Sequence, residues 1–286
     1  MIEIKNLEFS YKKTPVFSDI NLSFGDGVGS ADNLAKNGGI YGLLGENGVG
    51  KTTLLKLICG LLRPVSGTCT LDGQTCHDRL PSMLQRIVFL PDEVALPEMS
   101  TPQRYVDELQ PFYPAFSQSK FLHLMQELEV DPARRFREMS FGQQKKSIIA
   151  ATLALGTDYI LLDEPTNGLD IPSKAQFRSI LSSAADEGKT VIISTHQVRD
   201  VENLIDPIVI LSHSAVLLNA PVERITQKLL FEYGAEQRDD AFYSEMQPGG
   251  YLNVLPNTTG QESQLNIEAL FNAVLRNKNT FKELFK

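Results

Sequence analysis

Apolar and polar residues alternate at the start of the chain, between residues 2 and 24. A period of two is typical of strands that bury one face, and turn-forming residues interrupt the pattern between Tyr11 and Pro15. We therefore predict two strands joined by a turn. Five glycines follow among polar residues from Gly25 to Gly39, a composition typical of an exposed loop or hairpin tip.

Through the middle of the chain, short apolar runs alternate with patterns of helical period. Such runs are typical of strands buried on both faces, and helices between them are typical of a parallel sheet. We expect strands at Ile40–Leu44, Ile87–Leu90, Tyr159–Leu162, Val191–Ser194 and Ile208–Leu211. Between the second and third of these, prolines punctuate amphipathic segments without a strand signal, which predicts an inserted helical subdomain at about residues 92–139.

The C-terminal part of the chain carries weaker signals. After about residue 220, a polar stretch leads to an apolar run at Tyr251–Leu255 and to a last helix with one apolar face around Leu270. That face packs either against the chain itself, which is the more common arrangement, or into a partner. We predict a first domain over residues 1–220 and a C-terminal accessory extension over residues 221–286.

The composition of the 286-residue chain limits its function. Its net charge of −8 argues against broad affinity for nucleic acid, whose phosphates require a basic surface. The three cysteines lack a paired CxxC spacing, so we expect reduced structural thiols in a cytoplasmic protein. No apolar stretch is long enough to cross a bilayer, and Met1 leads into a strand pattern rather than a signal peptide. Any membrane role is therefore expected to come through a partner.

A glycine-rich sequence follows the predicted strand that ends at Leu44. Gly45-Glu46-Asn47-Gly48-Val49-Gly50-Lys51-Thr52 matches the phosphate-binding loop G-x4-G-K-[ST]. The glycines let backbone N–H groups turn toward phosphate oxygens at the start of a helix. Lys51 can neutralise the β- and γ-phosphates, and the Thr52 hydroxyl can bind Mg²⁺. A strand before the motif and a helix after it are the required context, so the sequence predicts binding of a nucleoside triphosphate.

Two acidic residues, Asp163 and Glu164, end the apolar run that begins at Tyr159. Ligands of open α/β sheets bind at the carboxyl edge, so both carboxylates are predicted to face the phosphate loop. Asp163 would hold Mg²⁺, directly or through water, and Glu164 would polarise the water that attacks the γ-phosphate. Two acids after an apolar run are by themselves an ordinary strand end, and the phosphate loop gives them this meaning.

Three further segments carry a resemblance to a known family. Met139-Ser140-Phe141-Gly142-Gln143-Gln144-Lys145 resembles the LSGGQ signature of the ABC (ATP-binding cassette) proteins. Asn167-Gly168-Leu169-Asp170 resembles their D-loop, and Ser194-Thr195-His196 resembles the segment of their switch histidine. The resemblance covers about residues 2–218. It implies an α/β P-loop NTPase of the ABC class in residues 1–220, with an N-terminal antiparallel β subdomain beside the mostly parallel core sheet and an inserted helical subdomain.

The resemblance also implies which residues bind ATP and Mg²⁺. In a head-to-tail homodimer, or a heterodimer with a related cassette, Ser140 and Gly142 of one subunit close over ATP held by the other. Tyr11 aligns with the aromatic residue that stacks on adenine, although an ordinary turn tyrosine remains the alternative. The implied catalytic residues are Lys51, Glu164 and His196, and the implied nucleotide-binding residues are Tyr11, Gly45, Asn47, Gly48, Gly50, Lys51, Thr52, Thr53, Ser140, Gly142 and Gln143.

Two positions depart from the family pattern. Phe141 replaces the usual glycine of the signature, which affects how the dimer closes. Asp92 stands where the family usually has glutamine, in a loop that touches Mg²⁺ or the attacking water. A carboxylate binds Mg²⁺ but adds negative charge near the triphosphate. The predicted metal ligands are thus Thr52, Asp163 and Asp92, with a helix-capping role of Asp92 as the alternative.

The resemblance predicts the ATP-hydrolysing subunit of a bacterial transporter of export type, because an acid at residue 92 resembles certain export subunits. Such a subunit is cytoplasmic, is peripheral on the inner face of the membrane and binds no nucleic acid. The helical insert would press on a separate integral membrane permease. Two alternatives stay open: a soluble ABC ATPase that acts on a ribosome, on DNA or in assembly, and a cassette that binds ATP without turnover. Neither cargo nor direction is specified by the motifs.

Overall fold

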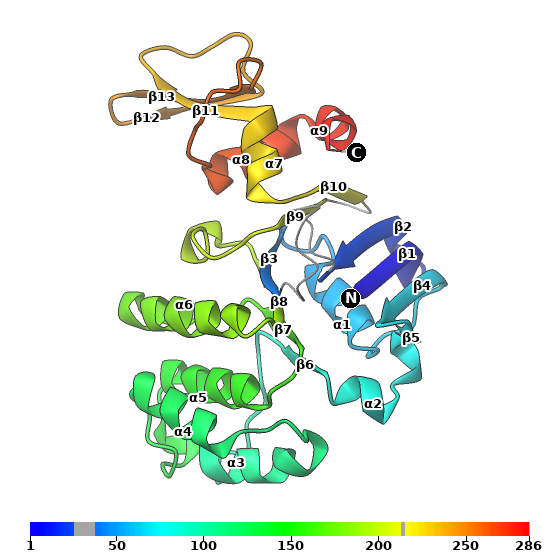
Figure 1. Cartoon of the computed structure of the whole chain (residues 1–286), viewed down its shortest axis with the longest axis vertical. Coiled ribbons are helices and arrows are strands. Elements are labelled where there is room, and N and C mark those ends of the chain that lie inside the picture. The colour runs from blue at the N-terminus through cyan, green and yellow to red at the C-terminus, as the bar shows by residue number, and fades with distance from the viewer. Residues whose placement is uncertain (26–37, 213–214, 286) are drawn as a thin grey trace.

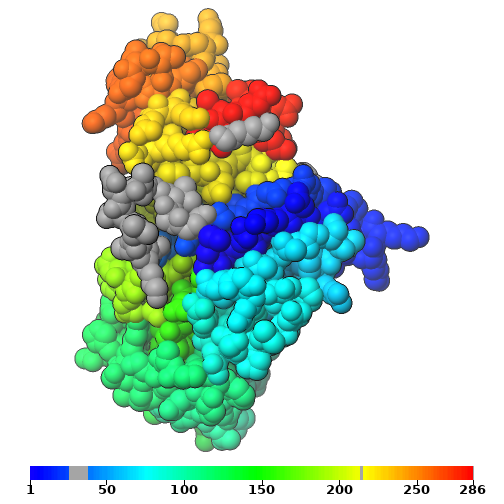
Figure 2. All heavy atoms as spheres, turned by 45° about the vertical axis from the view of Figure 1, so that its right-hand side comes forward, coloured from blue at the N-terminus to red at the C-terminus, as the bar shows by residue number. Residues whose placement is uncertain are grey.

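The computed structural model describes residues 1–25, 38–212 and 215–285, in which the strands form three sheets. The predicted glycine-rich loop lies largely outside the described residues. A six-stranded core sheet occupies the middle of the molecule, with an N-terminal sheet beside it (Figure 1). The C-terminal extension and the helical insert form the two opposite ends (Figure 2). Among the described helices, none combines the length and apolar character that a membrane crossing requires.

The N-terminal sheet is antiparallel, in the strand order β2-β1-β4-β5. The predicted pair of alternating strands is confirmed, and the alternate apolar residues of β1, among them Ile2 and Ile4, are buried. Two further strands belong to this sheet. They were not predicted, because they are short and polar. The strands are β1 (Ile2–Tyr11), β2 (Thr14–Phe24), β4 (Ser66–Leu71) and β5 (Gln74–Thr75).

The core sheet has the strand order β10-β9-β3-β8-β7-β6. All five predicted buried strands are confirmed, and they are parallel to one another; only β10 pairs antiparallel, with β9. One face packs on the N-terminal sheet and on the helices α1 (Lys51–Ile58) and α2 (Pro81–Leu84), and the other on the remaining helices, which explains runs that are apolar on both faces. The strands are β3 (Gly39–Leu44), β6 (Ile87–Leu90), β7 (Tyr159–Asp163), β8 (Thr190–Thr195), β9 (Ile208–Ser212) and β10 (Ala215–Ala220).

The helices of the first 220 residues surround this sheet. No strand interrupts residues 92–139, so the predicted helical character of the insert is confirmed. Its helices begin at the side-chain caps Thr101 and Ser117, and Phe121 and Phe136 are fully buried beneath them. The helices are α1 (Lys51–Ile58), α2 (Pro81–Leu84), α3 (Pro102–Leu109), α4 (Gln118–Glu127), α5 (Phe141–Ala154) and α6 (Ile171–Asp186).

The C-terminal extension contains a three-stranded antiparallel sheet, β11-β13-β12, and three helices. The apolar run at Tyr251–Leu255 lies within β13. The predicted helix with one apolar face around Leu270 is confirmed as α8, but it is not the last helix, because α9 follows it after Asn277. One hydrophobic core runs from the core sheet into the extension without interruption. The elements are α7 (Val222–Lys228), β11 (Leu229–Gly234), β12 (Tyr243–Gln247), β13 (Gly250–Pro256), α8 (Ile267–Arg276) and α9 (Lys278–Leu284).

Candidate functional site

A cavity of about 470 Å³ opens at the carboxyl edge of the core sheet. Its walls include the end of β1, the loop before α1, the loop after β6 and the ends of β7 and β8. The cavity brings together these predicted residues: Tyr11, Asn47, Gly48, Gly50, Lys51, Thr52, Thr53, Asp92, Asp163, Glu164 and His196. Val16 and Asn167, to which the sequence analysis gave no role in this cavity, also line it. Of the predicted nucleotide-binding residues, Gly45, Ser140, Gly142 and Gln143 do not line it in the single chain.

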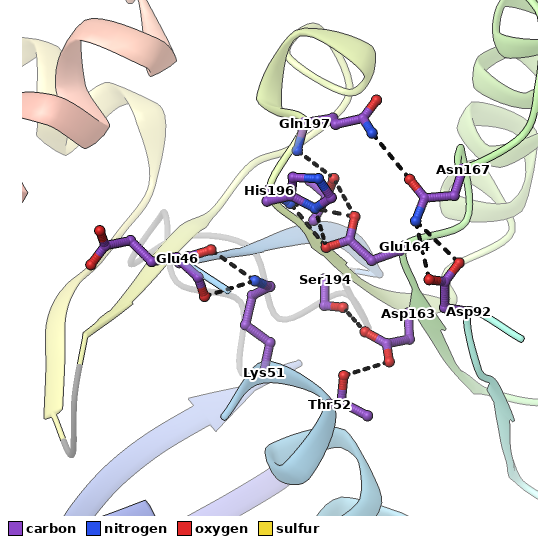
Figure 3. A network of polar contacts seen from close by, with 12 residues as sticks. Glu46, Lys51, Thr52, Asp92, Asp163, Glu164, Asn167, Ser194, His196 and Gln197 are labelled. Atoms are coloured by element: carbon purple, nitrogen blue, oxygen red, sulfur yellow. Dashed lines mark hydrogen bonds and ion pairs between the residues drawn. The ribbon is translucent and has the colours of Figure 1, made fainter. Parts of the chain in front are cut away.

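The phosphate-binding loop connects β3 to α1 in a tight turn. Gly50 has a φ of +106°, and a Cβ atom there would lie 2.7 Å from Cζ of Phe17, so a larger residue does not fit. The Lys51 ammonium donates hydrogen bonds to the carbonyl oxygens of Gly45 at 2.7 Å and Glu46 at 3.2 Å (Figure 3). Burial lowers the pKa of Lys51, although the negative charges of nearby acids oppose that shift. A cation held by neutral carbonyls inside a cavity is ready to bind an anion.

Thr52 and Asp163 meet across the cavity floor. The Thr52 hydroxyl donates to Oδ2 of Asp163 at 2.6 Å, and Ser194 donates to the other carboxylate oxygen. Mg²⁺ prefers oxygen ligands and is commonly held by one or two carboxylates together with substrate phosphates. The described residues contain no group of three or more acidic, histidine or cysteine side chains that could hold a metal. The hydroxyl of Thr52 and the carboxylate of Asp163 are oxygen ligands of the kind that hold Mg²⁺ together with a phosphate.

Glu164 lies directly beyond Asp163, and its backbone adopts a left-handed conformation with a φ of +45°. Its side chain is 11% exposed and accepts hydrogen bonds from the Thr195 hydroxyl at 3.0 Å and the His196 backbone N–H at 3.1 Å. Nδ1 of His196 lies 2.7 Å from Oε1 of Glu164. The turn at Glu164 and the end of β8 thus place a carboxylate and an imidazole side by side in one wall of the cavity (Figure 3), an arrangement that can orient a water molecule and accept its proton.

Tyr11 lies at the mouth of the cavity as the last residue of β1, rather than in the turn where the sequence analysis placed it. Its side chain is 46% exposed, and its hydroxyl lies 3.4 Å from the Thr53 hydroxyl. The ring of Phe9 packs edge-on against it, with the ring centres 4.9 Å apart. The exposed aromatic face is available to a ligand, and its contact with adenine stays a prediction.

Asp92 lines the cavity, but its carboxylate already has partners. Both oxygens accept hydrogen bonds from Nδ2 of Asn167, at 3.1 and 3.2 Å, and Nζ of Lys145 lies 3.5 Å from one of them. The next helix, α3, starts at Pro102 and is capped by Thr101, so Asp92 caps no helix. Its role as a metal ligand stays a prediction. The contacts with Asn167 and Lys145 were missed because they join residues 75 and 53 positions apart.

The predicted signature residues begin α5. The Ser140 hydroxyl accepts from the Gln143 backbone N–H at 3.3 Å, while the Gln143 side chain accepts from the Ser140 N–H at 3.1 Å, a reciprocal capping box. Phe141 is 56% exposed, and its ring lies so close to Gly168 that a Cβ atom there would come within 2.2 Å. This exposed helix start lies outside the cavity of its own chain, so it is free to face another subunit.

Comparisons with known proteins agree with this geometry. A family model described as ABC transporter matches residues 32–167. The chain is 31% identical to the ABC transporter ATP-binding protein NatA of Bacillus subtilis over 219 residues, which are 73% of the chain and 84% of NatA. It is 30% identical to the ABC transporter ATP-binding protein YtrB of the same organism over 205 residues, which are 71% of the chain and 66% of YtrB.

A solved dimeric ATP-binding cassette, in a post-hydrolysis state bound to ADP and Pi, is also similar in structure. It has a TM-score of 0.66 at 23% identity and covers 78% of this chain and 99% of its own. This likeness confirms the predicted fold class. The chain spans between 42% and 66% of the length of several curated relatives that it matches.

Proposed function

The chain belongs to the ABC transporter family, and on that premise we propose that it is the ATP-binding and ATP-hydrolysing subunit of a transporter. The observation that carries the proposal is the single cavity in which Lys51, Thr52, Asp163, Glu164 and His196 converge from three separate segments. NatA and YtrB are named as ATP-binding proteins of ABC transporters, which favours a transporter over a soluble ABC ATPase.

The geometry supports hydrolysis as follows. Lys51 exchanges its two carbonyl partners for the β- and γ-phosphate oxygens, so that the charge of the triphosphate is balanced inside the cavity. Thr52 and Asp163 would hold Mg²⁺, which neutralises charge on the phosphate oxygens. Glu164 accepts the proton of the attacking water, and His196, in contact with Glu164, orients that water in line with the γ-phosphate. Tyr11 provides a ring on which a base can stack.

The exposed start of α5 supports a head-to-tail dimer. Its first backbone N–H groups and the positive end of its helix dipole suit the γ-phosphate of ATP bound to a second subunit. Ser140, Gly142 and Gln143 then complete the site in trans. The partner is a second copy of this chain or a related cassette.

A separate membrane permease is the proposed partner of the helical insert. Asp92 is in contact with the nucleotide cavity and with α5, so closure of the dimer can move the insert relative to the core sheet. The chain would then be cytoplasmic and peripheral on the inner face of the membrane, and of export type. Residues 221–286 would form an accessory extension of an ATPase domain in residues 1–220.

The proposal is tested by the oligomeric state of the variant Glu164→Gln. Removal of the proton acceptor blocks hydrolysis but leaves the ATP ligands in place, so Mg-ATP should convert the variant into a dimer. The measurement is light scattering after size exclusion, with and without Mg-ATP. The wild-type chain, which hydrolyses its ATP, is the control and should show little dimer. A variant that binds Mg-ATP yet stays monomeric at saturation contradicts the dimer, and a chain that binds no Mg-ATP contradicts the whole proposal.

A further inference from the structure

Lys145 is a buried cation to which the proposed mechanism gives no role. It lies in the second turn of α5, and its side chain is 4% exposed. Its ammonium donates a hydrogen bond to the backbone carbonyl of Asp92 at 2.7 Å and lies 3.5 Å from the carboxylate of the same residue. A lysine is rarely buried unless it is paired, so the Asp92 loop is the reason that this ammonium can be buried here.

The charges around the cavity show why that pairing matters. Asp92, Asp163 and Glu164 place three carboxylates around a cavity that must accept a polyanion. Lys51 lies on the phosphate-loop side, and Lys145 is a second cation on the side of the helical insert. Burial lowers the pKa of Lys145. The negative charge of Asp92 opposes that shift most strongly, and those of Asp163 and Glu164 oppose it less, so the ammonium interacts with all three carboxylates.

The orientation of Asp92 continues into a chain of amide contacts. Asn167 donates to both Asp92 oxygens, and Gln197 donates to the Asn167 carbonyl oxygen at 3.1 Å (Figure 3). Gln197 directly follows His196. One line of polar contacts therefore runs from Lys145 in α5 through Asp92 and Asn167 to the segment of His196, and a charged pair lies at its start.

We propose that Lys145 is a positioning residue that neutralises Asp92 and holds its carboxylate toward Asn167, so that the acid at this position does not repel the bound nucleotide. The inference rests on the proposed function. Asp92 and Lys145 act together as a neutral pair. Without the lysine, the negative charge of Asp92 would not be balanced beside two other acids and the phosphates, and turnover would fall.

The test is a double-mutant cycle on this pair. Lys145→Met keeps an unbranched side chain of nearly the same length but removes its charge, and we expect kcat/KM for ATP to fall at least tenfold. In Asp92→Asn/Lys145→Met the amide can still contact Asn167 and no charge is left unpaired, so the double variant should recover most of the lost activity. Lys145→Arg should keep more activity than Lys145→Met. The matched control is Lys146→Met, on the same helix but bonded to the carbonyl of Leu128, and it should resemble the wild type.

The outcomes separate this inference from the proposed function. A double variant as defective as Lys145→Met, or a fully active Lys145→Met, overturns the inference. If Lys145→Met does not fold, the double variant alone decides. Recovery of both folding and activity on the second change would show that the defect came from the loss of the Asp92–Lys145 pair. If the wild type hydrolyses no ATP, the proposed function fails, but the pair can still be tested through melting temperatures without nucleotide. The two single changes must then lower the melting temperature by more, in sum, than the double change does.

Discussion

The nucleotide cavity and the C-terminal extension are built on different physical rules. At the cavity, several polar side chains are held by specific hydrogen bonds, as Thr52 is by Asp163 and His196 by Glu164. In the extension, large apolar side chains are buried without specific partners, among them Phe281 between Phe242 and Phe285. The positions of individual polar atoms therefore determine function in the nucleotide cavity, whereas the volume and burial of apolar side chains determine stability in the extension.

The largest effect that would separate the two regions is expected at Lys51. In Lys51→Met the charge-assisted hydrogen bonds to phosphate are lost, so affinity for Mg-ATP should fall by about 10- to 100-fold, given about 1.5–3 kcal/mol for a hydrogen bond to a charged group. Stability should stay the same or rise, because burial lowers the pKa of Lys51 and so disfavours its charged form in the folded state.

Titration calorimetry with Mg-ATP, together with a melting curve, measures both quantities. Lys56→Met, on the same helix but outside the cavity, is the matched control and should bind as the wild type does. If Lys51→Met unfolded, the side chains of the nucleotide cavity would determine stability, as the buried side chains of the C-terminal extension do.

The next effect is expected in the extension, at Phe281. Its side chain is fully buried, with its ring centre 5.3 Å from that of Phe242 and 6.1 Å from that of Phe285. Phe281→Ala leaves a cavity and should lower the free energy of unfolding by about 3 kcal/mol or more. Affinity for Mg-ATP should change little, because Phe281 does not line the nucleotide cavity.

Urea unfolding and the same calorimetric titration distinguish these outcomes. Phe112→Ala provides the control, since Phe112 is 67% exposed and its loss should change stability by less than about 0.5 kcal/mol. If ATP affinity fell in step with stability in Phe281→Ala, the two regions would be coupled through their shared core.

The smallest effect is expected at the cysteines, which are buried behind the phosphate-binding helix without taking part in the chemistry. Burial raises the pKa of the Cys59 thiol, and a hydrogen bond with Cys76 together with burial raises that of Cys69. Both thiols therefore stay protonated throughout the pH range of a folded protein, and the thiolate is the reactive form. Alkylation at pH 8 followed by mass spectrometry should find essentially no label on the native chain and three labels after denaturation. Rapid native labelling would show that this part of the core opens.

The sequence predicted the cavity well because its residues stand next to strong local signals. Gly45 to Thr52 form a motif with a fixed spacing, and Asp163 ends an apolar run that is long enough to identify a buried strand. Since the parallel strands end at one edge of the sheet, predicting the strands also predicted that the motifs would meet.

The remaining features depend on contacts that no local pattern encodes. The strands Leu229–Gly234 and Tyr243–Gln247 were missed because several of their side chains are partly exposed and polar, so their alternation is weak. The ion pair of Lys145 with Asp92 was missed because it depends on how the insert folds back on the core sheet. Residues far apart in sequence were predictable only where a shared sheet edge brings them together.

The left-handed backbone of Glu164 has a consequence for directed evolution. A residue with a branched or long side chain in that conformation costs about 1 kcal/mol or more relative to glycine. Glycine at this position would therefore relax the backbone while it removed the carboxylate that hydrolysis needs. The same change would leave the Thr195 hydroxyl and the His196 N–H without their acceptor, so the relief of the backbone and the lost hydrogen bonds oppose each other, and a library at this position has to be scored for turnover as well as for heat resistance.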